Sequence, residues 1–129
     1  ANVSLKYIDA VNAPDANFNA YLLSHFDSNS DGMISNSEAS TVSSIDCSSL
    51  GIASLQGIEA FTALSTLICP GNNLTQLNLS KNTKVVSIYC QNNQIATLDL
   101  SSNTSLGYCN CSMNSLSSIH LGNNKILYK

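Results

Sequence analysis

The sequence has few charged residues. Asp, Glu, Lys and Arg make up only 10% of its 129 residues, well below the roughly 25% that is usual in globular domains. Ser, Asn and Thr fill the deficit, which indicates a surface of hydroxyls and amides rather than of ion pairs. The net charge is −3, and no basic cluster occurs. Nucleic acids and anionic membranes are therefore poor candidates as partners.

Long apolar runs are also missing. No stretch of about 18 apolar residues occurs, so we expect no segment to insert into a membrane. The chain begins at Ala1 without an initiator Met, which fits a mature secreted protein or one trimmed at its N-terminus. Hydrophobic residues nevertheless make up 43% of the sequence, enough to build one continuous core in a domain of this length.

A repeat of constant length fills the second half of the chain. Its three copies are LSTLICPGNNLTQLNLSKNTK (64–84), VVSIYCQNNQIATLDLSSNTS (85–105) and LGYCNCSMNSLSSIHLGNNKI (106–126). Each copy begins with the pattern L-x-x-L-x-C-x-x-N-x-L, and its second half nearly repeats the first. The recurring columns are Leu64/Val85/Leu106, Leu67/Ile88/Cys109, Cys69/Cys90/Cys111, Asn72/Asn93/Asn114, Leu74/Ile95/Leu116, Leu77/Leu98/Ile119, Leu79/Leu100/Leu121 and Asn82/Asn103/Asn124.

The spacing of these columns predicts a solenoid. Alternating apolar residues mark a short strand with one buried face, and the Asn that follows can bond to the backbone where the chain turns. Stacked copies place each strand beside its equivalent at about 4.8 Å in parallel register. Each coil then buries its apolar columns against the next. Because both halves carry the pattern, we expect short strands on two sides of each coil and no regular helix on the convex side.

These copies resemble the nested leucine-rich repeats of the IRREKO class found in bacterial surface proteins. The stretch 45–61 resembles the first coil of internalin-like proteins, and it shares Cys47 and Ile52 with the later columns, although its spacing to them is longer by one position. The resemblance covers about residues 14–126. It implies a right-handed leucine-rich-repeat solenoid with short parallel strands over residues 43–129. The expected coils are 43–63, 64–84, 85–105 and 106–126.

The same resemblance implies a location and a class of function. Such proteins are extracellular or anchored at the bacterial surface, and they bind proteins or glycans. Asp99 and His120 occupy one column near several serines, which raises the idea of a hydrolase. The sequence has no nucleophile elbow, oxyanion-hole motif or pocket-forming insertion to support it. We therefore expect no enzymatic activity.

The five cysteines follow the repeat. Cys47, Cys69, Cys90 and Cys111 recur once in each coil at equivalent positions, so they form one column that points into the core, while Cys109 replaces the apolar residue of a neighbouring column. Disulfides are common in small exported proteins, but adjacent members of a parallel column point the same way, which is poor geometry for a bridge. We expect buried reduced thiols, and a metal or iron–sulfur site is disfavoured because a column does not converge on a point.

Residues 1–42 differ from the repeats and are interpreted as an N-terminal helical cap. Pro14 and Asp15 are a helix-start signal, and an apolar face follows them. A cap of this kind covers the apolar edge that the first coil would otherwise expose. The residues on the expected helix face are Phe18, Tyr21, Leu22 and Phe26.

A twelve-residue segment after Phe26, DSNSDGMISNSE (27–38), matches the EF-hand calcium-loop pattern. Gly32 falls at the sixth position, where a sharp turn is needed, and Ile34 at the eighth supplies an apolar anchor. Hard oxygen ligands at alternate positions followed by a distal carboxylate suit calcium. The expected ligands are Asp27, Asn29, Asp31, the Met33 carbonyl, Ser35 and Glu38.

Two departures from the pattern bear on this calcium site. Only one loop is present where sensor EF-hands pair, and the helix after Glu38 is expected to be short. We therefore expect a structural ion of modest affinity, with a dissociation constant of roughly 10⁻⁴ M. The alternative is a polar loop of the same shape that stays empty or holds water or sodium.

Outward positions on the first strand of each coil suggest a binding surface. An apolar and aromatic strip flanked by amides is expected there, and tyrosines on a rigid surface are favoured anchors for partners. The candidate partner-binding residues are Ile68, Tyr89, Tyr108, Asn110 and Met113.

Two functions remain open at this point. The first is a surface module that binds a protein or glycan through the repeats, and the second is a calcium-stapled scaffold of a larger surface protein with no ligand of its own. The C-terminal end raises a separate question, because no polar segment follows the last coil. An uncovered solenoid end templates association, so we expect either an end-to-end homodimer or a plug formed by Leu127 and Tyr128.

Overall fold

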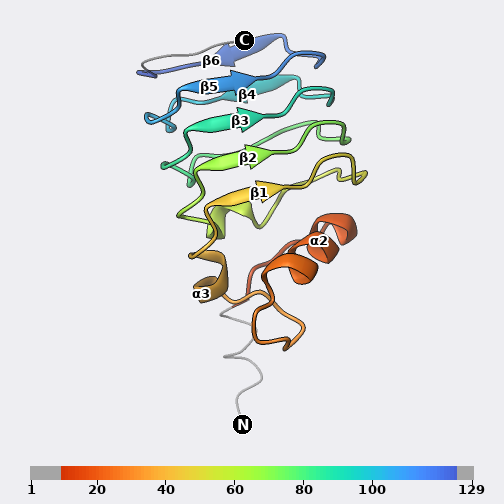
Figure 1. Ribbon diagram of the computed structural model, residues 1–129. Helices are drawn as coiled ribbons and strands as arrows, with labels where there is room; N and C mark the ends of the chain where they lie inside the picture. The colour runs from red at the N-terminus through yellow and green to blue at the C-terminus, as the bar shows by residue number, and fades with distance from the viewer. Residues whose placement is uncertain (1–9, 125–129) are drawn as a thin grey trace.

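The computed structural model describes residues 10–124 as a stack of coils with a helical segment against its first coil (Figure 1). No helix in this range is long and apolar enough to cross a membrane. The elements are α2 (Ala16–Phe26), α3 (Asn36–Ala39), β1 (Ser44–Asp46), the 3-10 helix η1 (Ile58–Ala60), β2 (Thr66–Ile68), β3 (Ser87–Tyr89), β4 (Thr97–Asp99), β5 (Tyr108–Asn110) and β6 (Ser118–His120).

The helix α2 starts where the sequence indicated. The carboxylate of Asp15 accepts hydrogen bonds from the backbone N–H groups of Asn17 and Phe18, both at 3.0 Å. These bonds satisfy two of the N–H groups that a helix start leaves without partners. The face that carries Phe18, Tyr21 and Leu22 is buried, so α2 is the amphipathic helix that the spacing predicted.

One parallel sheet runs through all the coils in the order β1-β2-β3-β5. Its register pairs Leu67 with Ile88 and Ile88 with Cys109, which is the register that the repeat columns require. Each inward side chain therefore lies beside its equivalent in the next coil. The leucine-rich-repeat solenoid expected from the sequence is confirmed.

The second side of the solenoid is less regular than expected. A two-stranded parallel sheet forms there from β4 and β6, and β4 lies behind the larger sheet in Figure 1. The two earlier coils have no strand at the corresponding positions, and the first of them turns through η1 instead. Strands on this second side thus occur in the last two described coils only.

Asparagines join successive coils, as their spacing suggested. The Asn72 amide donates to the carbonyls of Cys47 and Cys69, at 3.0 and 3.1 Å. Its Oδ1 accepts from the N–H groups of Leu50 and Ile52, both at 3.0 Å. A buried amide that bonds to two coils satisfies backbone groups that a tight turn leaves unpaired.

A single apolar core extends from α2 into the coil that holds β5. The cysteine column lies within it: Cys47, Cys69 and Cys90 are fully buried, and Cys111 in the last described coil is half-buried. No disulfide joins the five cysteines in the part of the chain that the structure describes. The expected position of this column in the core is confirmed. The end of the predicted coil 106–126 and the proposed plug of Leu127 and Tyr128 lie outside the described residues.

The helix α2 covers the edge of the first coil with polar contacts as well as apolar ones. The N–H of Asp46 donates to the Tyr21 hydroxyl at 3.0 Å. The Asp15 carboxylate also accepts from Ala53 N–H at 2.9 Å and from Ser54 N–H at 3.3 Å. One carboxylate therefore caps the helix and holds it to the solenoid.

Candidate functional site

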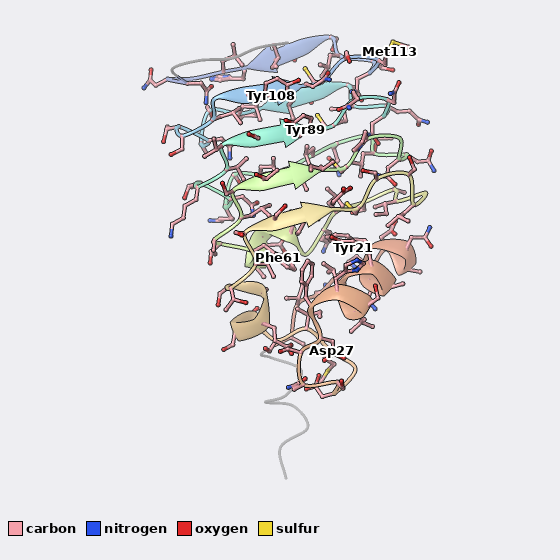
Figure 2. All side chains as sticks on the ribbon, viewed as in Figure 1. Tyr21, Asp27, Phe61, Tyr89, Tyr108 and Met113 are labelled. Carbon is pink, nitrogen blue, oxygen red and sulfur yellow. The ribbon has the colours of Figure 1, made fainter. Side chains whose placement is uncertain are left out.

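The predicted calcium loop lies between α2 and α3. It begins at Asp27, which ends α2, and it includes Ser35, which caps α3. Figure 2 shows Asp27 in the turn below α2, at the end of the molecule opposite β6. We call residues 27–38 the cap loop.

The cap loop brings three acidic side chains together. One carboxylate oxygen from each of Asp27, Asp31 and Glu38 lies within 4.8 Å of the other two. These residues occupy the first, fifth and twelfth positions of the EF-hand pattern. Three converging carboxylates of this kind form a hard-oxygen donor set that fits calcium.

Backbone N–H groups hold the carboxylates in place. Asp27 accepts from Asp31 N–H at 3.2 Å and from Gly32 N–H at 3.0 Å. Gly32 has φ of 83°, a left-handed conformation that glycine adopts without a Cβ clash. Asp31 N–H also bonds to Asn29 Oδ1 at 3.2 Å, and Met33 N–H donates to Asp31 at 3.0 Å. Asn29 and Met33 thus lie beside the acidic cluster, as the pattern predicted.

Glu38 closes the loop from its far end. Its Oε1 accepts from the N–H groups of Ser28 and Asn29, at 3.0 and 3.3 Å, and its Oε2 accepts from Ser35 N–H at 2.8 Å. The bond from Ser35 is the main cause of a lowered pKa of Glu38, although partial burial opposes it. Ser35 Oγ in turn accepts from Glu38 N–H at 3.0 Å, which completes a capping box. Ser35 therefore contacts Glu38, the expected bidentate ligand.

The cap loop has a backbone partner that sequence reasoning missed. Val11 N–H donates to the Ile34 carbonyl at 2.7 Å, and Ala10 and Ser35 form an antiparallel bridge. The side chain of Ile34 is buried in the common core. No alternation around residues 10–11 signals this pairing, because a bridge of one residue pair has no period. The backbone bridge and the buried Ile34 side chain therefore attach the cap loop to the rest of the structure.

The larger sheet presents the predicted aromatic surface. Tyr89 on β3 and Tyr108 on β5 have ring centroids 5.0 Å apart at an interplanar angle of 37°, and Figure 2 shows them on neighbouring strands. Ile68 and Asn110 are the register partners of Tyr89. All four side chains are half-buried. We call Ile68, Tyr89, Tyr108 and Asn110 the tyrosine face.

Met113, also a predicted contact residue, lies apart from this face. It is in the turn after β5, with φ of 56°, and Figure 2 shows it at the side of the solenoid, away from the two tyrosines. Its side chain is 75% exposed. A left-handed turn residue points away from the strand surface, which the spacing alone did not reveal. The structure therefore brings four of the five candidate residues together.

We compared the chain and its structure with known proteins. No protein-family model matches the chain. Internalin J of Listeria monocytogenes serotype 4b (strain F2365) is 41% identical to it over 70 residues, which are 54% of this chain and 8% of that protein. A structure of the functional domain of Listeria monocytogenes internalin J, described as including a cysteine ladder, has a TM-score of 0.75 and 38% identity. That match covers 80% of this chain and 23% of the other.

This is an internalin-like leucine-rich-repeat solenoid. The structure of internalin F from Listeria monocytogenes is also similar, with a TM-score of 0.72 and 25% identity over 90% of this chain and 38% of the other. The internalin-like resemblance seen in the sequence is thus confirmed. Because the chain spans only 8% of the length of internalin J, the activities and partners of the whole relative are not carried over.

Proposed function

We propose that this chain is a non-enzymatic interaction module at a bacterial cell surface, and that it binds a protein partner through the tyrosine face. The observation that carries the proposal is the pair of adjoining tyrosines on a regular parallel sheet. Internalin-like repeat domains are typically protein-interaction modules, which supports the same class. The similarity to surface proteins of Listeria supports the extracellular location.

The tyrosine face has the features of a binding anchor. Tyrosine supplies a large amphipathic contact with little conformational entropy to lose, and the hydrogen-bonded strands beneath hold the rings in a fixed arrangement. Asn110 Oδ1 accepts from Ser112 N–H at 3.1 Å, so its amide N–H₂ remains available to a partner. A protein is favoured over a glycan because adjoining tyrosines on a rigid surface are typical anchors of protein interfaces.

A capture experiment tests this proposal. The immobilised chain is exposed to solubilised host-surface proteins, and the bound protein is then purified and its affinity measured. Replacing both Tyr89 and Tyr108 with Ser is expected to weaken binding at least tenfold, or about 1.4 kcal/mol. The matched control is Val86→Ser, because Val86 is 44% exposed but lies outside the face.

The outcomes separate the proposal from its alternative. Equal binding by the double variant and the parent chain contradicts a role for the tyrosine face. The alternative function is a structural spacer without a ligand of its own, and it predicts that neither proteins nor glycans are retained. If a glycan is retained and its binding depends on the two tyrosines, the tyrosine face is the binding site but its partner is a glycan rather than a protein.

The cap loop serves as a calcium staple in the same proposal. The ligands would be Asp27, Asn29, Asp31, the Met33 carbonyl, Ser35 and Glu38. Calcium would neutralise the three converging carboxylates, which otherwise repel one another. We expect bound calcium to stabilise the fold because the cap loop is attached to the solenoid. Phe26, directly before the loop, packs on Phe61 of the first coil with ring centroids 6.1 Å apart.

Thermal unfolding tests the staple. A ligand that binds only the folded state adds RT ln(1 + [L]/Kd), so millimolar calcium over a Kd near 10⁻⁴ M contributes roughly 1.4 kcal/mol. The melting temperature is expected to rise with calcium and fall with chelator, and Asp27→Ala is expected to abolish the difference. Ser37→Ala, in the same loop but not a ligand, is expected to keep it. An identical melt with calcium and with chelator excludes the staple.

A further inference from the structure

A groove crosses the second side of the solenoid, away from the tyrosine face and the cap loop. Its larger part has a volume of about 420 Å³ and lies between the first two coils. A second hollow of about 350 Å³ continues it towards β4. The two share the wall formed by Gln76, Leu77, Asn78 and Ser80.

The groove follows the columns of the repeat. Its floor holds the buried residues Leu55, Ile58 and Leu77. Polar residues that flank the leucines along the chain recur at equivalent positions of successive coils. The two flanking columns are Ser54/Gln76/Thr97 and Gln56/Asn78/Asp99, and all six residues line the groove.

The hollow arises where the second sheet is missing. The strand β4 pairs with β6 only, and the first coil leaves the strand path at Gly57 to form η1. Gly57 has φ of 108°, and a Cβ there would lie 2.9 Å from the Asn12 carbonyl oxygen. A side chain at this position would therefore disturb the turn that leads to Glu59, which lines the groove.

Several polar side chains in the groove have no hydrogen-bond partner among residues 10–124. The amides of Gln56 and Gln76, and the Lys81 ammonium, make no hydrogen bond or ion pair among the described residues. Asn78 uses only its Oδ1, which accepts from Ser80 N–H at 3.0 Å. Free amides offer a donor and an acceptor side by side, and a sugar hydroxyl is both at once.

The composition of the groove favours a sugar over a peptide. An apolar floor with a few polar groups around it is typical of small-ligand sites, and the CH faces of sugar rings suit such a floor. Protein hot spots need exposed aromatic or Arg anchors, whereas the large exposed apolar side chains of the described residues all lie elsewhere. Lys81 and Glu59 carry opposite charges, so the larger hollow selects no charged ligand.

From these observations we propose that the groove binds a neutral oligosaccharide. The apolar faces of its sugar rings lie over Leu55 and Leu77, and its hydroxyl or acetamido groups bond to Gln56, Gln76 and Asn78. Successive coils repeat the polar columns, so a chain of repeating sugar units meets polar groups at each step. This site is separate from the tyrosine face and does not depend on the proposed function.

Amide NMR titration of the full chain tests the site with tri-N-acetylchitotriose, cellotriose and mannotriose as probes. At least one probe is expected to bind saturably in the millimolar range, with shifts confined to residues 54–59, 76–81 and 97–102. Gln76→Ala combined with Asn78→Ala is expected to weaken that binding at least tenfold. Tyr89→Ser, which alters only the opposite side, is the matched control and leaves it unchanged.

Three results overturn the proposal. The first is the absence of saturable binding by all three sugars up to about 10 mM. The second is binding that the Gln76/Asn78 variant retains while its amide spectrum shows an intact fold. The third is binding that Tyr89→Ser removes, because that result places the sugar on the tyrosine face. Saturable binding of short polar peptides in this groove without any sugar binding makes it a peptide site instead.

Discussion

The two asparagine columns look alike in the sequence but bond differently. In the first half of the coil, Asn93 donates to the carbonyls of Cys69 and Cys90, both at 3.1 Å, and accepts from Leu74 N–H at 3.0 Å. In the second half, Asn103 donates to two carbonyls, but its buried Oδ1 has no hydrogen-bond partner in the described part of the chain. The repeat predicts the positions of both columns. It does not predict that a backbone N–H, that of Leu74, points at the side-chain oxygen of Asn93 while none points at that of Asn103.

The difference predicts unequal costs of substitution. Asn93→Ala leaves the buried Leu74 N–H without a partner and removes one of the two amide donors from each of the Cys69 and Cys90 carbonyls, so it is expected to lower the free energy of unfolding by about 3 kcal/mol. Asn103→Ala removes the unpaired oxygen together with the amide and is expected to cost about 1 kcal/mol. Urea denaturation of the two variants measures the difference. Equal losses contradict the assignment of the Leu74 bond as the stronger contribution.

Asp15 joins the cap to the solenoid in a way that depends on pH. Burial alone would raise its pKa, but hydrogen bonds from four backbone N–H groups outweigh burial and hold the pKa below the ordinary value of 3.8. A lowered folded-state pKa stabilises the fold above the unfolded pKa, near 3.9, and that stability is lost as the pH falls through the folded value.

Asp15→Asn tests this pH dependence. The variant is expected to be less stable at pH 7 by about 1–2 kcal/mol, because an amide turns one N–H₂ towards backbone donors. It is also expected to lose less stability than the parent between pH 5 and pH 3. Urea midpoints across this pH range measure both effects. Parallel curves for variant and parent show that Asp15 is not the titrating group.

At the scale of elements, the cysteine column is a part of the core whose thiols react slowly with electrophiles. Burial, with a smaller contribution from the charge of Asp46, raises the pKa of Cys47 to about 12. Burial also raises the pKa of Cys69. Since the thiolate is the reactive form, these side chains are nearly inert at neutral pH. Their spacing was sufficient to predict this, because a residue at a repeat column shares the surroundings of its neighbours.

Thiol counting tests the column. In the native protein a maleimide is expected to modify Cys111 first, because it is half-buried while the other four thiols are buried. All five thiols are expected to react after denaturation. Cys90→Ser is expected to cost about 1–3 kcal/mol, since it replaces a buried thiol with a more polar hydroxyl in an apolar core. Fewer than five reactive thiols in the denatured protein indicates a disulfide and refutes the reduced column.

Elements that follow a sequence repeat or motif could be predicted from the sequence, and elements that follow neither could not. The strands β2, β3 and β5 follow from the alternation around Leu67, Ile88 and Cys109, and the cap loop follows from its twelve-residue pattern. The groove of the second side was missed because it depends on strands that fail to form beside Gln76. Whether a short strand pairs is decided by the path of the neighbouring coil, which no single column encodes.

At the scale of the molecule, stability in a solenoid spreads through contacts between neighbouring coils. The core residues of the middle coils are almost fully buried, whereas Ile119 and Leu121 of the last described coil are 43% and 39% exposed. The cap fastens the opposite end through Asp15, Tyr21 and the cap loop. Local opening is therefore expected to begin near β6 and to be rarest near β2.

Hydrogen exchange measured at two protein concentrations tests this gradient together with the expected end-to-end dimer. In dilute solution the amides of Ser118–His120 are expected to exchange faster than those of Thr66–Ile68, because fewer contacts must break to expose them. If two copies associate through this coil, protection of Ser118–His120 rises with concentration, and Ile119→Lys abolishes the rise by placing a charge on the contact. Protection that is uniform along the stack refutes the gradient. Protection near β6 that does not depend on concentration excludes the dimer, because association must follow mass action.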